Sequence, residues 1–207
     1  LEGFSLDGTV LTMVGGYDFE FGATSGNTTY RYGHLFIDID MDAEYGEVIA
    51  DSGYNREFVN RTFGYDYVLT YDGESDSEGN PMFAAYALGE DTILQLVSDS
   101  HAQGSNPWRY AEGGEWVGAG AFDYYRDVDG AALGFQGGWH NAVQVDLGFL
   151  FDADPLFGQD HITFHFTYEC GNDNLMGRHI VPEPSSMILL GMGLAGFVTM
   201  RMRKKSA

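Results

Sequence analysis

The stretch His161-Ile-Thr-Phe-His-Phe-Thr-Tyr168 decides the fold, because its apolar and polar side chains alternate without a break. A period of two is typical of a β-strand, whose successive side chains point to opposite faces. One face of this strand carries the large apolar residues Ile162, Phe164, Phe166 and Tyr168. The other face carries His161, Thr163, His165 and Thr167. We predict that the apolar set faces a core and that His161, Thr163 and His165 face solvent.

The same pattern recurs along the chain. Two more segments alternate clearly, namely His34–Asp40 and Ala142–Phe149. Further strand candidates are Thr9–Met13, Tyr17–Phe21, Tyr65–Tyr71, Met82–Leu88 and Thr92–Val97. Pieces rich in glycine and acidic residues, Asp72–Asn80 and Ala111–Gly120, are predicted to be loops. Many short strands at hairpin-like spacing predict an all-β fold, an antiparallel β-sandwich or jelly roll.

The charge of the chain is unevenly distributed. Residues 1–180 hold six arginines, no lysine and 30 acidic residues, which gives this part a net charge of −24. Such a surface repels phosphate backbones, which are bound through Lys and Arg. Nucleic-acid binding is therefore excluded as a function. The simplest interpretation of the many acidic residues is a solvated surface. The more specific interpretation is that they bind divalent cations.

The C-terminal tail differs from everything before it. Val181-Pro-Glu-Pro-Ser-Ser186 is followed by 14 residues without charge, 187–200, and then by a basic end. As a helix, Ser185–Met202 would extend about 27 Å, slightly less than the ~30 Å hydrocarbon core of a bilayer. The basic end consists of Arg201, Arg203, Lys204 and Lys205. Such a cluster stays in the cytoplasm, so everything before Pro182 is expected outside.

These three parts, in this order, resemble the PEP-CTERM sorting signal of Gram-negative bacteria. The resemblance implies that an exosortase recognises Pro182, Glu183 and Pro184 and removes the span and the basic end. The predicted partners are thus the exosortase, the inner membrane in the precursor, and an exopolysaccharide at the destination. The implied location is the cell surface or extracellular matrix. A plain C-terminal membrane anchor behind a proline-rich stalk is the alternative.

This resemblance divides the chain into a β-sandwich domain, 1–180, and a sorting signal with a membrane-spanning helix, 181–207. The segment ending in Cys170-Gly-Asn-Asp173 resembles the last strand of many proteins that carry such signals, and we interpret it as a final core strand followed by a turn. No N-terminal signal peptide is visible, and the chain starts at Leu1, so we interpret it as a mature or truncated form.

Acidic residues at alternate positions are the best candidate site within the domain. Asp38, Asp40 and Asp42 would project from one face of a strand, and they could converge on Ca²⁺ if the strand ends in a loop there. A solvated acidic strand face is the alternative. Two more acidic loops are weaker candidates: Asp72, Glu74, Asp76 and Glu78, and Asp152, Asp154 and Asp160. Calcium is the only cofactor that the sequence suggests.

No catalytic pattern stands out in the sequence. His161 and His165 would lie about 13 Å apart on a strand, which is too far to share one zinc ion. The residues Trp108, Trp116 and Trp139 are interpreted as core or turn packing rather than as sugar-stacking surfaces. We therefore interpret the protein as a non-enzymatic, exported component of the surface or biofilm matrix. A secreted glycan-binding module or carbohydrate-active enzyme is the alternative.

Overall fold

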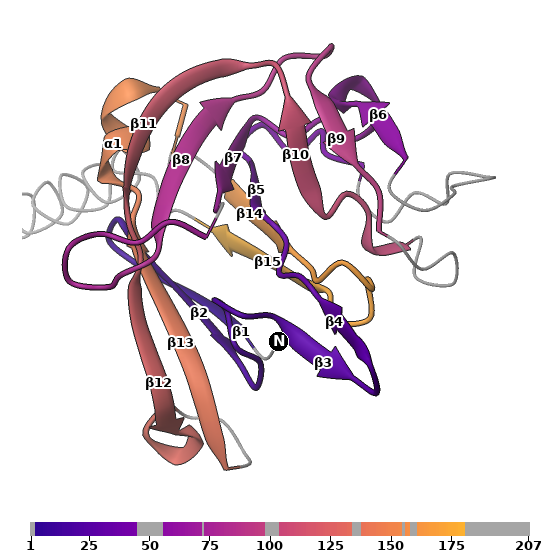
Figure 1. Ribbon diagram of the computed structural model, residues 1–207. Coiled ribbons are helices and arrows are strands. Elements are labelled where there is room, and N and C mark those ends of the chain that lie inside the picture. Colours follow the sequence, from indigo (N-terminus) through magenta and orange to yellow (C-terminus); the bar gives the residue numbers. More distant parts are fainter. Residues whose placement is uncertain are drawn as a thin grey trace, which may run out of the picture.

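The computed structural model describes residues 3–44, 56–71, 73–97, 104–133, 138–154, 156–157 and 161–180. Within them the chain forms antiparallel sheets with few helical turns (Figure 1), so the prediction of an all-β antiparallel fold is confirmed. The only α-helix of this part is the short α1, Gly148–Ala153. None of its helices is long and apolar enough to cross a membrane. The helix expected in 181–207 lies outside the described residues.

A six-stranded sheet forms the centre of the fold, with the strand order β11-β8-β7-β5-β14-β15. Its strands are β11 (Glu115–Ala121), β8 (Met82–Ala87), β7 (Tyr67–Thr70), β5 (Leu35–Asp38), β14 (His161–Phe166) and β15 (Leu175–Ile180). Side chains alternate across it as the sequence predicts. In β5, for example, Leu35 and Ile37 face one core cluster, and Phe36 faces another.

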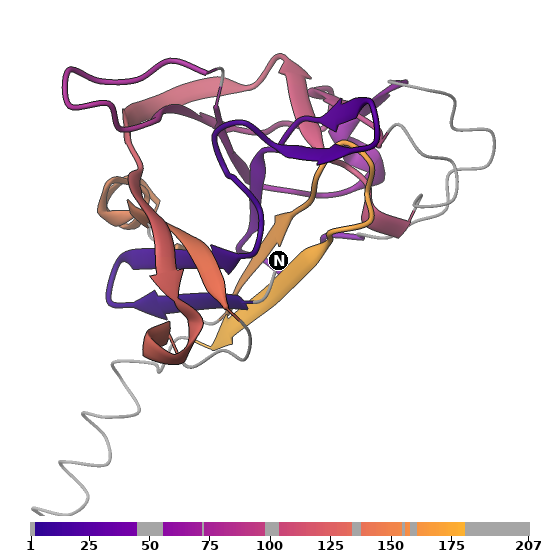
Figure 2. The same ribbon diagram turned by 60° about the horizontal axis from the view of Figure 1, so that its bottom comes forward.

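A four-stranded sheet, ordered β1-β2-β13-β12, covers one face of the central sheet. It consists of β1 (Gly3–Asp7), β2 (Val10–Gly15), β13 (Trp139–Asp146) and β12 (Asp123–Asp129). The main core lies between the two sheets: Leu11, Met13 and Val145 of the smaller sheet meet Leu69 and Phe164 of the larger one. Figure 2 shows the N-terminal strands in indigo beside the orange and yellow strands β14 and β15.

A third sheet covers the opposite face of the central one. It contains β10 (Arg109–Glu112), β9 (Ile93–Gln95) and β6 (Glu57–Val59), in the order β10-β9-β6. Its Leu94 packs with Phe36 and Val68 in the second core cluster. A small hairpin, β3 (Ala23–Ser25) with β4 (Thr28–Tyr30), completes the strands of the described chain. A two-layer sandwich therefore describes only part of this packing.

Because the third sheet and the loop before it cover the central sheet, one prediction about the polar side chains of β14 is wrong. Ile162, Phe164, Phe166 and Tyr168 are buried, as predicted. Thr163 and His165, however, are also buried, with exposures of 2% and 0%, and His161 is half-buried. The prediction that these three residues face solvent was wrong. A strand in the middle of a covered sheet buries both faces, and its polar side chains then need internal partners.

Several predicted boundaries also change. Ala142–Phe149 was predicted as one strand, but β13 ends at Asp146 and α1 begins at Gly148. The predicted loop Ala111–Gly120 is wrong, since it contains the end of β10 and most of β11. The segment that ends in Cys170 is not the last strand of the domain, because β15 follows it at the sheet edge.

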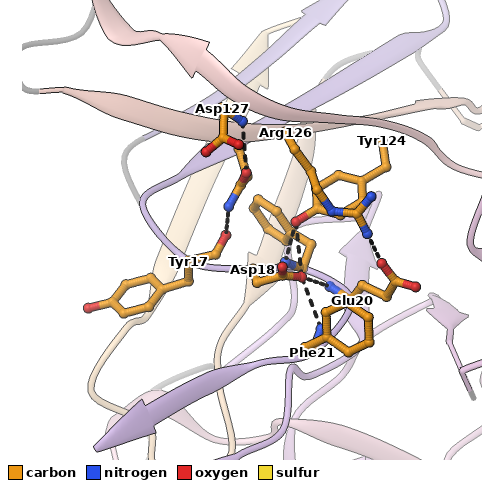
Figure 3. A network of polar contacts seen from close by, with 9 residues as sticks. Tyr17, Asp18, Glu20, Phe21, Tyr124, Arg126 and Asp127 are labelled. Atoms are coloured by element: carbon orange, nitrogen blue, oxygen red, sulfur yellow. Dashed lines mark hydrogen bonds and ion pairs between the residues drawn. The ribbon is translucent and has the colours of Figure 1, made fainter.

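The predicted strand Tyr17–Phe21 is instead a turn held by the Asp18 side chain (Figure 3). Its Oδ1 atom accepts hydrogen bonds from the backbone N–H groups of Glu20, at 2.8 Å, and Phe21, at 3.0 Å. The Tyr124 hydroxyl donates to the same atom at 3.0 Å. Arg126 beside it forms an ion pair with Glu20. An Asp side chain that binds the backbone two residues on is typical of turns and competes with strand pairing.

Candidate functional site

The acidic residues Asp38, Asp40 and Asp42 come together where β5 ends. Only Asp38 lies in the strand; the chain then bends, and Met41 adopts a left-handed backbone conformation with φ of 69°. One oxygen of each carboxylate lies within 4.8 Å of the others. The convergence therefore comes from a bend after the strand, which is the condition that the calcium hypothesis required.

Backbone hydrogen bonds hold this bend in place. The Met41 N–H donates to Asp38 Oδ1 at 2.8 Å, and the Asp42 N–H donates to Asp40 Oδ1 at 3.1 Å. Gly64 lies against the bend with φ of +75°, and a Cβ atom there would lie 2.6 Å from Asp42 Oδ1. Only glycine fits this approach without strain. Each Asp that accepts a hydrogen bond through Oδ1 keeps its second oxygen as a potential cation ligand.

A fourth carboxylate, Asp66, joins the cluster from the chain just before β7. Its Oδ2 atom accepts the Ile39 N–H at 2.7 Å. Burial, together with the nearby negative charges, raises the Asp66 pKa to about 6, although the hydrogen bond from Ile39 opposes this. Asp66 was not predicted from the sequence, because the antiparallel pairing of β5 with β7 brings it here from 27 residues away. The sequence carries no local signal for that pairing.

Ionisation of Asp38 and Asp42 is also unfavourable. Burial raises the pKa of Asp38, and Asp40 adds to this, while Arg178 on β15 opposes it. Desolvation also raises the pKa of Asp42, followed by the effect of Asp40. Ionised carboxylates in such an arrangement repel one another, and a bound divalent cation would offset the repulsion. The geometry and the oxygen ligands suit Ca²⁺, whose binding here stays a prediction.

The other predicted acidic sites serve local structure in the described residues. Asp76 accepts hydrogen bonds from the backbone N–H groups of Glu78 and Asn80, both at 2.8 Å, and so closes a turn. Asp154 accepts a hydrogen bond from the Tyr67 hydroxyl at 2.7 Å. Asp72 and Asp160 lie outside the described residues. So do the sorting residues Pro182, Glu183 and Pro184 and the basic residues Arg201, Arg203, Lys204 and Lys205.

The tryptophans divide into two groups. Trp108 is fully buried, as predicted, whereas Trp116 and Trp139 have exposures of 61% and 71%. The prediction of core or turn packing was therefore wrong for these two. Both lie on strands, Trp116 on β11 and Trp139 at the start of β13, and their rings are open to solvent.

Comparison with known proteins identifies the tail but finds no match for the domain. No curated protein and no solved structure shows significant similarity to the chain. A family model, described as the PEP-CTERM protein-sorting motif, matches residues 181–204, which confirms the resemblance in the sequence. The chain thus carries, at residues 181–204, the PEP-CTERM protein-sorting motif of exported proteins whose membrane-anchored precursors are processed by an exosortase.

Proposed function

We propose that this protein is a non-enzymatic component of the cell surface or extracellular matrix of a Gram-negative bacterium, where its β-sandwich domain associates with exopolysaccharide. The match of residues 181–204 to the sorting motif carries the proposal, since it gives the chain a route out of the cell. The net charge of −21 supports it, because a strongly charged surface remains soluble outside the cell. The sequence offers no nucleophile–base motif that would favour catalysis.

Processing at the motif is the experiment that tests the proposal. In cells that contain an exosortase, we expect mass spectrometry of the surface fraction to find a C-terminus close to Pro184. The double variant Pro182→Ala/Pro184→Ala should stay unprocessed, because it lacks both prolines of the recognised sequence. The neighbouring substitution Ser185→Ala serves as the control and should be processed normally. An intact end from Arg201 to Lys205 in the surface fraction would show a plain membrane anchor instead.

A second candidate function, glycan binding, is favoured by a polar cleft between the central and third sheets. Its volume is about 370 Å³. Its lining consists of His34, Glu57, Thr70, Tyr86, Gln95, Arg109, Tyr110, Ala111 and Glu112. Among these, Glu57, Gln95 and Arg109 are paired in register across β6, β9 and β10. In this row the Glu57 side chain accepts hydrogen bonds, the Gln95 side chain donates and accepts them, and the Arg109 side chain donates them. A ligand with many hydroxyl groups needs such neighbouring donors and acceptors.

Rigid aromatic and histidine side chains support this cleft. Tyr86 and Tyr110 are stacked, with ring centroids 4.8 Å apart and planes at 15°. The Tyr110 N–H donates to His34 Nδ1 at 3.1 Å. Burial, and then the positive charge of Arg109, lowers the His34 pKa well below its ordinary value, so the ring stays neutral. One Arg and two Glu side chains leave little net charge in the cleft, which favours a neutral sugar over a charged one.

Calorimetry with neutral oligosaccharides tests this second candidate. We expect the intact protein in detergent to bind a neutral gluco-oligosaccharide, and Gln95→Ala to weaken that binding about tenfold, the effect of one lost hydrogen bond. Gln144→Ala is the matched control, because Gln144 lies on β13 in the four-stranded sheet, away from the cleft, and donates to Thr12. Equal affinities for the two variants, or no binding by the native protein, would exclude a glycan site in this cleft.

A further inference from the structure

The last described strand leads directly into the sorting motif. β15 ends at Ile180, and only Val181 separates it from Pro182. The four residues that follow Ile180, up to and including Pro184, can reach at most about 14 Å from it. A folded domain of this length has a radius of gyration of about 16 Å. Because the motif begins so close to the end of β15, the exosortase must approach the folded domain closely in order to bind the motif.

This short connection determines which end of the domain meets the enzyme. Ile180 pairs with His161, so β15 ends where β14 begins. Arg178 pairs with Thr163, which in turn pairs with Asp38 at the end of β5. The end of the central sheet that carries these residues therefore faces the membrane and the exosortase in the precursor.

β15 contributes little to the core at that end. Within the described chain it is an edge strand, paired only with β14. None of its described side chains, from Leu175 to His179, belongs to either core cluster. Its middle residue, Gly177, lies under the Phe4 ring, which approaches the position of a Cβ atom to 2.7 Å. A strand with few buried apolar contacts opens locally at a small fraction of the global unfolding free energy.

We propose that β15 separates from β14, starting at Ile180, when the exosortase takes up the motif, and that the sheet end around His161, where β14 begins, is the surface that contacts the enzyme. Opening the strand adds its six residues to Val181, the one residue that separates it from Pro182. The catalytic site of a membrane enzyme can then enclose the motif while the rest of the domain stays folded. The inference rests on the proposed processing by exosortase.

A disulfide between the two strands tests the proposal. The variant Thr163→Cys/Arg178→Cys, made with Cys170→Ala, places two thiols directly opposite each other in the register. Opposite Cβ atoms lie about 4.5–5.5 Å apart, which a disulfide can bridge with a small adjustment. The full-length precursor is incubated in membranes that contain an exosortase, with and without dithiothreitol. A second variant carries the same substitutions and a flexible Gly/Ser insertion of about ten residues after Ile180, long enough to replace the six residues of β15 that strand opening would release.

We expect oxidation to slow processing of the first variant at least tenfold and to leave the variant with the insertion unaffected. The reduced form of the first variant is its own control, since it has the same substitutions. Equal processing of its oxidised and reduced forms would overturn the proposal. So would a block by oxidation that persists with the insertion, because the strand would then not be the obstacle. If the native protein itself is not processed, the result contradicts the proposed processing by an exosortase, and this inference, which rests on it, is contradicted as well.

Discussion

The domain is expected to lose on the order of 3 kcal/mol of stability through His165 alone as the pH falls from 7 to 4. The ring is fully buried, and burial lowers its pKa to about 4, although its hydrogen bonds to backbone carbonyls oppose this. The folded state therefore prefers the neutral ring, whereas the unfolded chain takes up a proton near pH 6.5. The contribution is present above pH 6.5 and is lost as the pH falls towards 4.

Other groups titrate in the same interval, so the test compares variants. Burial lowers the pKa of His34 as well, which adds to the loss. The pKa values of Asp38, Asp42 and Asp66 are raised, so these carboxyl groups stabilise the fold as the pH falls and act in the opposite direction. A difference between two chains that share all these groups isolates the effect of His165.

Urea unfolding of His165→Gln at pH 7, 5 and 4 measures this difference. Glutamine does not titrate, and its amide can donate to the Pro107 carbonyl, as His165 Nε2 does at 2.7 Å. We expect the stability change between pH 7 and pH 4 to differ from that of the native protein by about 3 kcal/mol. His179→Gln, on the edge strand β15, is the control and should keep the native profile. A native profile for His165→Gln would contradict the expected effect.

His165 also shows why the sequence predicts one face of a strand better than the other. The alternation from His161 to Tyr168 correctly gives the strand and its apolar face, because large apolar side chains are rarely left in water. The polar face has the same pattern whether it meets solvent or a third layer. Here Tyr65 stacks on the His165 ring, with centroids 5.7 Å apart, and the Pro107 carbonyl accepts a hydrogen bond from His165 Nε2. Both partners come from segments that no local pattern connects to β14.

The sorting motif and the acidic cluster also differ in how far the sequence alone predicts them. The motif is linear, so its order of prolines, apolar span and basic end could be recognised in full from the sequence. The cluster is only partly local: Asp38, Asp40 and Asp42 are close in sequence, whereas Asp66 arrives through strand pairing. Sequence spacing suggested that the first three could converge if the strand ends in a loop there. The bend at Met41, after the end of β5, fulfils that condition.

Calcium is expected to stabilise the domain more than sodium does at the same ionic strength. Asp38, Asp40 and Asp42 hold carboxylate oxygens within 4.8 Å of one another. Burial and the neighbouring negative charges make the ionised forms of Asp38 and Asp42 costly. Screening by salt lowers this repulsion equally for both cations at matched ionic strength. A specific site adds RT ln(1 + [L]/Kd), or about 2.7 kcal/mol when calcium is present at 100 times its Kd. The excess over sodium therefore measures binding.

Thermal unfolding at pH 7.5, with millimolar CaCl₂ or with NaCl of equal ionic strength, makes this comparison. We expect Asp40→Asn to lose most of the calcium excess, because an amide oxygen carries no charge and the exposed Asp40 has little other structural role than its bond to the Asp42 N–H. Asp123→Asn is the matched control: it removes the same charge from an exposed position on β12, in a different sheet, and should keep the full excess. If the two variants respond alike, or if calcium and sodium stabilise the native protein equally, the acidic cluster binds no calcium. The other interactions of the fold would then offset the repulsion between its carboxylates.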